Sequence, residues 1–328
     1  MAYSPRALLA KSPFDGFVVA IITAVVVASL FPARGSFAEV MDKVVIGAIA
    51  LLFFLYGARL HPREAIAGLT HWRLHLTILA FTFVVFPILG VAMRPLVEPI
   101  VGHDLYLGLL FACLLPSTVQ SSIAFTSISR GNVPGAIVSA SLSNLLGVFV
   151  TPLLVVALMS TASGVHIDAS SIIKLMAQIL LPFILGQLAR RWIAGWVQRY
   201  SEPTKIVDRG SIVLVVYVAF SEGVRNGIWS QVTVWQVVGV AAVAAVLVVV
   251  MLVVTGSLPP RLGFNRADTI AIQFCGSKKS LATGLPMATV LFAGGPVGLL
   301  VLPLMIFHQI QLILCSVLAT RYAKAGEQ

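Results

Sequence analysis

Charged residues are scarce in this chain, and carboxylates are the scarcest of them. Only 10% of the 328 residues are charged, and Asp and Glu together number 12. Soluble globular domains carry about a quarter of their residues as charges, so an ordinary soluble fold is excluded. Apolar residues make up 59% of the chain, and many gather in runs of about 20 residues, the length that a helix needs to cross a bilayer. The composition therefore predicts an all-α polytopic membrane protein, with the lipid bilayer as its surroundings.

Cysteine is also rare, and the sequence motifs of two hydrolase classes are absent. Cys113, Cys275 and Cys315 lie inside apolar runs and lack the spacing of a metal site. Neither His-Glu-x-x-His nor Gly-x-Ser-x-Gly occurs, and the carboxylates lie at or near the ends of apolar runs. An intramembrane enzyme is therefore disfavoured, and we expect a protein without enzymatic activity or a bound cofactor. The sequence leaves a metal site and the oligomeric state open.

The net charge of +10 comes without an aromatic-basic module or a zinc spacing, so it does not indicate nucleic-acid binding.

The apolar runs predict ten spans, near residues 14–31, 40–60, 74–93, 105–129, 133–160, 170–192, 206–222, 233–254, 268–292 and 296–320. Fifteen of the 22 Lys and Arg residues fall on the side of the N-terminus, five fall on the other side, and two lie within a span. We expect the protein in the bacterial inner membrane or plasma membrane. Because cytoplasmic loops are rich in Lys and Arg, we expect both termini in the cytoplasm.

The two lysines within a span are the adjacent Lys278 and Lys279. A charge at the bilayer centre costs about 2.5 to 3.5 kcal/mol or more, so such residues are functional candidates. In an unbroken helix the two side chains would point about 100° apart, and one would lack a partner. Gly276 before them and Thr283-Gly284 after them therefore predict a break in the ninth span.

Five spans followed by five spans give two halves, residues 1–165 and 166–328, of inverted orientation. Matching polar islands support this repeat: Pro116–Ser122 in the fourth span and Gly276–Ser280 in the ninth. Paired helix breaks of this kind indicate a substrate site in a transporter, because the broken ends offer N–H groups to anions and carbonyls to cations. Close helix packing is the alternative for the small hydroxyl residues. The candidate substrate- or ion-binding residues of the islands are Ser117, Thr118, Gln120, Ser121, Ser122, Ser277, Lys278, Lys279 and Ser280.

Two further polar groups lie in neighbouring spans. Ser143 and Asn144 in the fifth span are within reach of the same site, although helix packing explains the serine equally well. His308, Gln309 and Gln311 form a cluster in the tenth span, from which His308 and Gln309 are secondary candidates. A lone histidine in a membrane is more often a packed, hydrogen-bonded residue than a proton relay.

These residues resemble the bile acid:sodium symporters, solute carrier family 10, over nearly the whole chain. The resemblance is carried by Leu115–Ser122, Arg130–Asn132, Thr151-Pro152 and Gly276–Leu281. The last segment is similar to the branch that contains the seventh human member and many bacterial relatives. The resemblance implies a single transmembrane transporter domain. In it, spans 1, 2, 6 and 7 form a panel, spans 3, 4, 5, 8, 9 and 10 form a core, and the broken fourth and ninth helices cross in the core.

The chain departs from the family pattern at the sodium ligands. By resemblance, Gln273 takes the place of a sodium-binding carboxylate, and Ser277 and Lys278 take the place of an amide-bearing stretch. Ala136 and Ala140 take the places of two hydroxyl ligands. The site that binds sodium in the better-known branch thus lacks several oxygen ligands here, which puts coupling to two sodium ions in doubt.

A tethered ammonium is a monovalent cation, and it can bind the carbonyls at the end of a helix. We therefore hypothesise that one of the two lysines fills a cation position and that the other attracts the anionic group of a substrate. The expected function is secondary transport of a small organic anion by alternating access, with sodium or a proton as the coupling ion. The alternatives are a proton-coupled or uncoupled carrier, a channel, or a membrane protein without transport that affects ion homeostasis.

Overall fold

The computed structural model describes residues 16–59, 71–163, 169–225, 227, 232–293 and 295–325. Every regular element within these ranges is a helix, which confirms the all-α prediction. The first residues of the predicted first span, the last residue of the second span and residues 166–168 at the start of the predicted second half lie outside the described residues.

The chain divides into two compact units. The first comprises Met1–Arg59, Pro182–Gln231 and Phe292–Gly298, and the second comprises Leu60–Leu181, Val232–Leu291 and Leu299–Gln328. Helix α11 runs from Ala169 to Arg199 and helix α16 from Val297 to Ala325, so both contribute to the two units.

The first unit contains α2 (Gly16–Leu30), α3 (Gly35–Arg59) and α12 (Ser201–Arg225) beside the later part of α11. Helix α12 packs on both α2 and α3. An ion pair between Arg59 and Asp208 joins α3 to α12. Helices α3 and α11 approach each other closely at Gly57 and Gly186. A Cβ atom on Gly57 would clash with the backbone carbonyl of Phe183.

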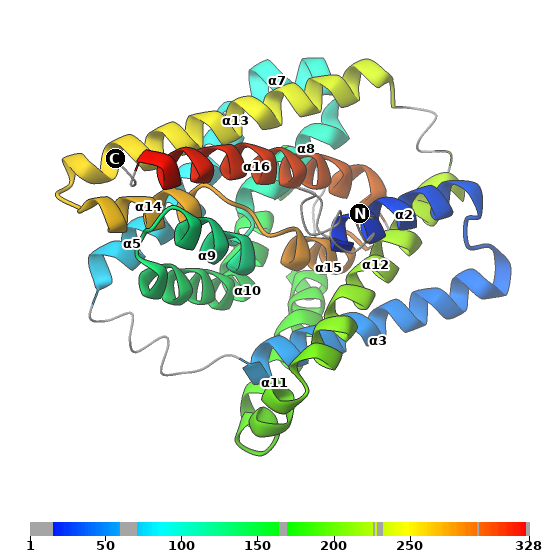
Figure 1. Ribbon diagram of the computed structural model, residues 1–328. Helices are drawn as coiled ribbons and strands as arrows, with labels where there is room; N and C mark the ends of the chain where they lie inside the picture. Colours follow the sequence, from blue (N-terminus) through cyan, green and yellow to red (C-terminus); the bar gives the residue numbers. More distant parts are fainter. Residues whose placement is uncertain are drawn as a thin grey trace, which may run out of the picture. The chain divides into compact units, whose positions relative to one another are not determined.

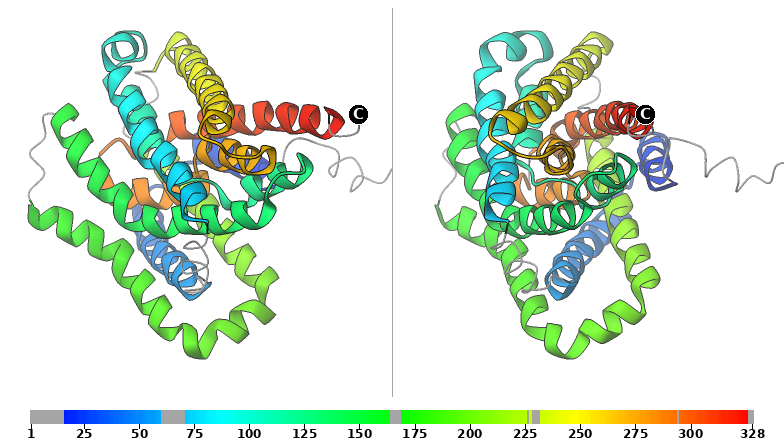
Figure 2. Two further views of the ribbon diagram at one scale, coloured as in Figure 1. Left: turned by 90° about the vertical axis from the view of Figure 1, so that its left-hand side faces the viewer. Right: turned by 60° about the vertical axis from the view of Figure 1, so that its left-hand side comes forward.

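The second unit holds most of the helices. They are α5 (Trp72–Ala80), the π-helix η1 (Phe81–Val85), α6 (Phe86–Ala92), α7 (Arg94–Val101), α8 (His103–Leu114), α9 (Val119–Ile128), α10 (Val133–Ser163), α13 (Val234–Arg261), α14 (Arg266–Gly276), α15 (Leu281–Leu291) and most of α16. Helix α14 lies in the middle of this unit, where it contacts α5, α9, α10 and α13 (Figures 1 and 2). All of its residues from Asp268 onward are buried, as expected for a helix with neighbours on every side.

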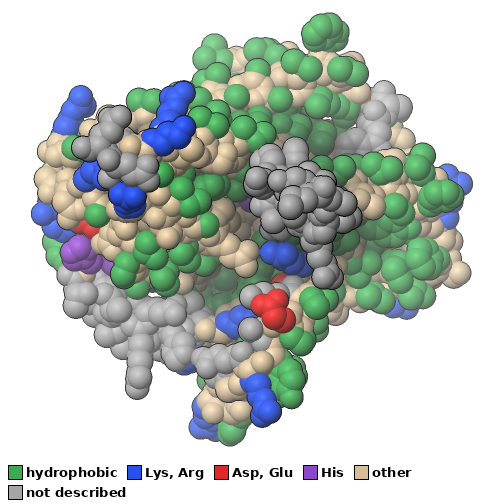
Figure 3. Space-filling view, in the orientation of Figure 1, with side chains coloured by type: hydrophobic (Ala, Val, Ile, Leu, Met, Phe, Trp, Pro, Cys, Tyr) green, Lys and Arg blue, Asp and Glu red, His purple; other side chains and the backbone are tan. Residues whose placement is uncertain are grey.

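The outer surface of the second unit is apolar along its helices and basic at one end. Helix α13 begins at a capping box between Thr233 and Gln236, and beyond it exposes a series of valines. Hydrophobic side chains gather along this helix in the space-filling view (Figure 3). Basic side chains gather where α13 ends, α14 begins and α16 ends (Figure 3). The exposed basic residues there are Arg261, Arg266, Arg321 and Lys324.

Four described helical segments are long and apolar enough to cross a membrane. They are Trp72–Ala92, Val133–Met159, Val234–Arg261 and Val297–Lys324. Helices α8 and α9, bent by 63° at the break between them, add a fifth if the pair counts as one span. These segments coincide with the predicted third, fifth, eighth, tenth and fourth spans. The full set of ten spans in two inverted repeats stays a prediction.

Candidate functional site

The break between α8 and α9 follows from a proline. Pro116 has no backbone N–H, and its ring disfavours a helical conformation for the residue before it. Leu115 accordingly has ψ 157°, in the extended region, and ends α8. Thr118 is extended as well, with ψ 132°, and α9 begins directly after it.

The second break lies between α14 and α15 and spans Ser277 to Ser280. Helix α14 ends at Gly276, and Ser280 caps the next helix, since its hydroxyl accepts a hydrogen bond from the backbone N–H of Thr283 over 3.2 Å. The sequence thus predicts both interruptions correctly: the second lies within its polar island, and the first begins one residue before its island.

The two breaks lie against each other. Hydroxyl groups at the first break donate hydrogen bonds to backbone carbonyls at the end of α14, where the second break begins. Ser117 donates to the carbonyl of Cys275 over 2.6 Å, and Ser122 donates to that of Phe274 over 3.0 Å. These are carbonyls in the last turn of α14, where no backbone donor remains for them. In return, the N–H of Ser280 donates to the carbonyl of Pro116 over 2.9 Å. We call this junction the crossing, defined by residues 115–122 and 276–283.

Helix α10 fixes the crossing from the side. The hydroxyl of Ser143 accepts from the N–H of Ser117 over 3.0 Å. The amide of Asn144 donates to the carbonyl of Ser117 over 2.6 Å and accepts from the hydroxyl of Thr283 over 2.9 Å. Asn144 therefore bonds to both breaks, and both α10 candidates lie at the site that the sequence assigns to them.

Lys279 is fully buried, and its ammonium group donates three hydrogen bonds to backbone carbonyls. The acceptors are Thr82 at 2.8 Å, Cys113 at 2.7 Å and Leu115 at 2.7 Å. The ring of Phe86 lies 4.2 Å from the same nitrogen, measured to the ring centroid. An ammonium has three N–H donors and a neutral amine only two, so these three acceptors match the charged form.

The π-helix makes the first of these carbonyls available. In an α-helix the carbonyl of Thr82 would accept from the N–H of Phe86, but that N–H donates to Phe81 instead. The residue after Phe86 is Pro87, which has no N–H to offer. The carbonyl of Thr82 is thus left without a partner in its own helix, and Lys279 supplies one.

The broken end of α8 provides the other two carbonyls. The backbone N–H of Ser117, four residues after Cys113, donates to a side chain of α10 rather than back to α8. The carbonyl of Leu114 accepts a hydrogen bond from the hydroxyl of Thr151 over 2.9 Å. The carbonyls on either side of it, those of Cys113 and Leu115, accept from Lys279. The three carbonyls thus converge on the ammonium of Lys279.

A glutamine from α16 holds the backbone of Lys279. The side-chain amide of Gln311 accepts from the N–H of Lys279 over 2.9 Å and donates to its carbonyl over 2.8 Å. The same amide nitrogen lies 2.9 Å from Nδ1 of His308. Thr118 donates to the carbonyl of Lys279 as well, over 2.9 Å. Gln309 makes no hydrogen bond to any described residue, so Gln311 rather than Gln309 is the glutamine at the crossing.

Lys278 is also fully buried, but its surroundings are aromatic. Its ammonium nitrogen lies 3.8 Å from the ring centroid of Phe125 and 5.9 Å from that of Phe274. It has no hydrogen-bond partner among the residues that the structure describes. The two adjacent lysines therefore point into different environments, one rich in carbonyls and one formed by rings.

The remaining candidates lie at the edge of the crossing or turn away from it. Gln273 donates to the carbonyl of Leu252 over 2.8 Å and accepts from the hydroxyl of Tyr322 over 2.7 Å, so it faces α13 and α16. Ser277 donates back to the carbonyl of Gln273 over 2.5 Å. Gln120 is exposed, and it makes no hydrogen bond within the described ranges.

Four threonine or glutamine residues that contact the crossing lie outside the candidates that the sequence predicts. They are Thr82, Thr151, Thr283 and Gln311. Thr283 is detectable in retrospect, because it follows the second island at the spacing of a helix cap. Thr82 contributes its backbone carbonyl. Because every residue has such a carbonyl, the sequence does not single out this position.

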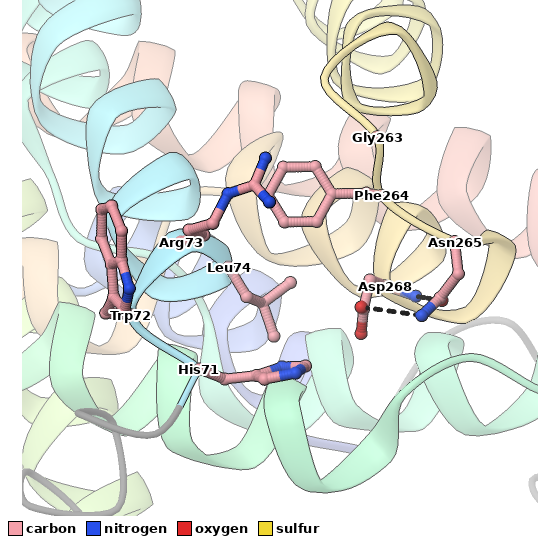
Figure 4. Close-up of a pocket in the computed structure, with 8 residues that line it drawn as sticks. All are labelled: His71, Trp72, Arg73, Leu74, Gly263, Phe264, Asn265 and Asp268. Atoms are coloured by element: carbon pink, nitrogen blue, oxygen red, sulfur yellow. Dashed lines mark hydrogen bonds between the residues drawn. The ribbon is translucent and has the colours of Figure 1, made fainter.

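A second polar group lies where α14 begins. Asp268, which is buried, accepts from the side-chain amides of Asn132 over 2.6 Å and Asn265 over 3.0 Å. It borders a cavity of about 230 Å³ between the start of α5 and the loop before α14, and Figure 4 shows the guanidinium of Arg73 beside the ring of Phe264 there. Because both carboxylate oxygens already accept hydrogen bonds, this group serves to fix α14 to the start of α10.

Comparison with known proteins gives one family and several relatives. The profile of the SBF-like CPA transporter family matches residues 15–324. The chain is 53% identical to the uncharacterized protein PA2026 of Pseudomonas aeruginosa, over 94% of this chain and 93% of that protein. It is 50% identical to the putative symporter YfeH of Escherichia coli K12, over 96% and 94%. It is 30% identical to the sodium/bile acid cotransporter 7 of Mus musculus, over 95% and 93%.

Proposed function

Because the chain belongs to the SBF-like CPA transporter family, we propose that it is a secondary transporter that carries a small organic anion across the membrane by alternating access. The observation that carries this proposal is the crossing of two broken helices within one compact unit. Broken helices of this kind bring backbone N–H and carbonyl groups to membrane depth, where they can bind an ion or a substrate.

In this proposal Lys279 fills the position of a coupling cation. Its ammonium group has three carbonyl ligands between 2.7 and 2.8 Å, and Phe86 lies on another side. A bound sodium ion would compete with a lysine for these oxygens. The side chains at the positions of the family's sodium ligands support the same view, since Gln273 faces away and Ala136 and Ala140 have no side-chain oxygen.

The two compact units support the division into a panel and a core. The second unit, which contains the crossing, is the core in this proposal, and the first unit is the panel. Both termini lie in the cytoplasm, as the distribution of basic residues predicts. The basic cluster where α13 ends and α14 begins then marks the cytoplasmic end of the core.

A counterflow experiment tests the proposal. Proteoliposomes that contain the full chain are loaded with unlabelled organic anions, and uptake of a labelled anion from the same set is followed. We expect saturable counterflow by the wild type and a loss of at least about tenfold in Lys279→Met, because three carbonyls then lack their cation. An exposed lysine provides the matched control, Lys43→Met, which should transport normally. Absence of counterflow by the wild type for every anion would contradict the proposal.

A proton-coupled carrier is the second candidate. It is favoured by Lys278, since an amine without a hydrogen-bond partner is free to lose or gain a proton during the cycle. Wild-type uptake that follows an imposed pH gradient would favour this coupling over an uncoupled carrier, and any uptake that remains in Lys278→Met should no longer depend on that gradient.

A further inference from the structure

The ammonium of Lys278 is the least satisfied polar group at the crossing. It is fully buried, it has no hydrogen-bond partner among the described residues, and the rings of Phe125 and Phe274 lie near it together with the thiols of Cys275 and Cys315. Aromatic faces attract a cation, but they replace only part of the hydration that an ammonium loses on burial. An ionisable residue within the membrane is a functional candidate, and a buried cation without a partner of opposite sign is able to bind an anionic group.

Lys279 cannot share this role. All three of its donors are used by the carbonyls of Thr82, Cys113 and Leu115. Lys278 and Lys279 are the only fully buried cationic side chains within the described ranges. One unpaired positive charge is therefore available at the crossing, and it belongs to Lys278.

Helix α9 carries the ring that lies next to this charge. Phe125 is only partly buried, whereas Lys278, whose ammonium nitrogen lies 3.8 Å from the centroid of that ring, is fully buried. Ser121 lies one turn before Phe125, and side chains four residues apart share a face of a helix. The hydroxyl of Ser121 is buried and has no partner among the described residues, so it is a second free donor on that face.

We propose that Lys278 binds the single anionic group of the substrate, with Ser121 as a second donor and with Phe125 as a ring that the anion displaces from the ammonium. This assignment rests on the proposed function and narrows it. A single free cation surrounded by rings fits a monovalent carboxylate or sulfonate with an apolar or aromatic body. A dianion would bring a second charge for which the crossing has no unpaired cation.

Equilibrium binding of three probes of similar shape tests the assignment. Benzoate is a monoanion, benzamide is its neutral counterpart, and terephthalate is a dianion with the same ring. Binding to the full chain in nanodiscs is measured by calorimetry. We expect the wild type and Lys43→Met to bind benzoate at least about tenfold more tightly than either other probe, as a desolvated charge pair implies. In Lys278→Met the preference for benzoate over benzamide should disappear, and Lys278→Arg should retain part of it.

A stability measurement separates this role from a structural one. Lys278→Met removes an unpaired buried charge, so its midpoint of thermal unfolding should equal or exceed that of the wild type. A structural lysine would instead lower the midpoint when it is replaced. A lower midpoint, a benzoate preference that survives in Lys278→Met, or a wild type that prefers benzamide or terephthalate would each overturn the assignment.

Counterflow measured in parallel distinguishes the two levels of failure. If the wild type exchanges organic anions while benzoate binding does not depend on Lys278, the transporter proposal stands and only this assignment fails. If the wild type exchanges no organic anion, the proposed function fails and the assignment fails with it.

Discussion

At the scale of single residues, Lys279 and Lys278 show how adjacent identical side chains acquire different environments. Lys279 lies where η1 and the end of α8 leave three carbonyls without partners, and Lys278 lies where Phe125 and Phe274 offer rings. At the helix break the two side chains point in different directions. Sequence alone predicts that the pair is buried and functional, but the choice of which lysine binds carbonyls depends on the backbone.

Gln311 should contribute more to stability than its neighbour Gln309. Gln311→Leu removes the acceptor of the buried N–H of Lys279, and an unpaired buried donor costs about 1 to 3 kcal/mol. The carbonyl of Lys279 keeps its bond from Thr118. Chemical unfolding in mixed micelles should show a loss of that size for Gln311→Leu and a change within about 0.5 kcal/mol for Gln309→Leu. Equal effects of the two substitutions would mean that the backbone of Lys279 finds another donor or acceptor.

At the scale of helices, small residues decide how closely α3 and α11 approach. A Cβ atom on Gly57 would meet the carbonyl of Phe183, and one on Gly186 would meet that of Phe54. Both obstacles are backbone atoms, which cannot rotate away as a side chain can. This close approach within the first unit therefore requires glycine at both positions.

Alanine substitutions on α3 should separate this packing effect from helix propensity. Gly57→Ala is expected to lower the free energy of unfolding by about 1 to 3 kcal/mol, as overpacking does. Gly47 lies on the same helix with open space around it, so Gly47→Ala should raise the free energy by about 0.5 to 1 kcal/mol. Thermal unfolding of the purified variants measures both signs. A Gly57→Ala variant as stable as Gly47→Ala would show that the two helices separate easily.

The same scale shows where sequence reasoning succeeds and where it stops. The Pro116 and Gly276 islands predict both breaks, because proline and glycine act on the backbone around them. The π-helix at Phe81–Val85 is not predicted, since its five residues include neither proline nor glycine and only the nearby Pro87 distinguishes the segment. The orientation of Gln273 toward α13 and α16 is likewise absent from the sequence, because it depends on which helices pack against α14.

At the scale of the whole molecule, the composition predicts the class of protein better than the number of spans. Within the described ranges, apolar runs identify every segment that is long and apolar enough to cross a membrane by itself. Helix α12 carries charges within it, such as Asp208 and Arg209, and α2 is only 15 residues long, so length and composition do not assign these helices to the bilayer. The ten-span inverted repeat therefore depends on the family pattern and on the symmetry of the two breaks.

If Lys279 acts as a permanent cation in the proposed core, it also determines what can drive transport. A gradient does work only through an ion that binds one conformation and is released from another, and a tethered ammonium is never released. If Lys279 fills the cation position, replacing external sodium by potassium should change initial uptake into proteoliposomes by less than about twofold, since an ion without differential binding shifts no equilibrium. Lys279→Ala removes the ammonium and leaves the carbonyls of Thr82, Cys113 and Leu115 without it, so uptake by this variant should increase with sodium concentration. Saturable dependence of wild-type uptake on sodium, with no change in that dependence in Lys279→Ala, would show that the coupling ion binds elsewhere.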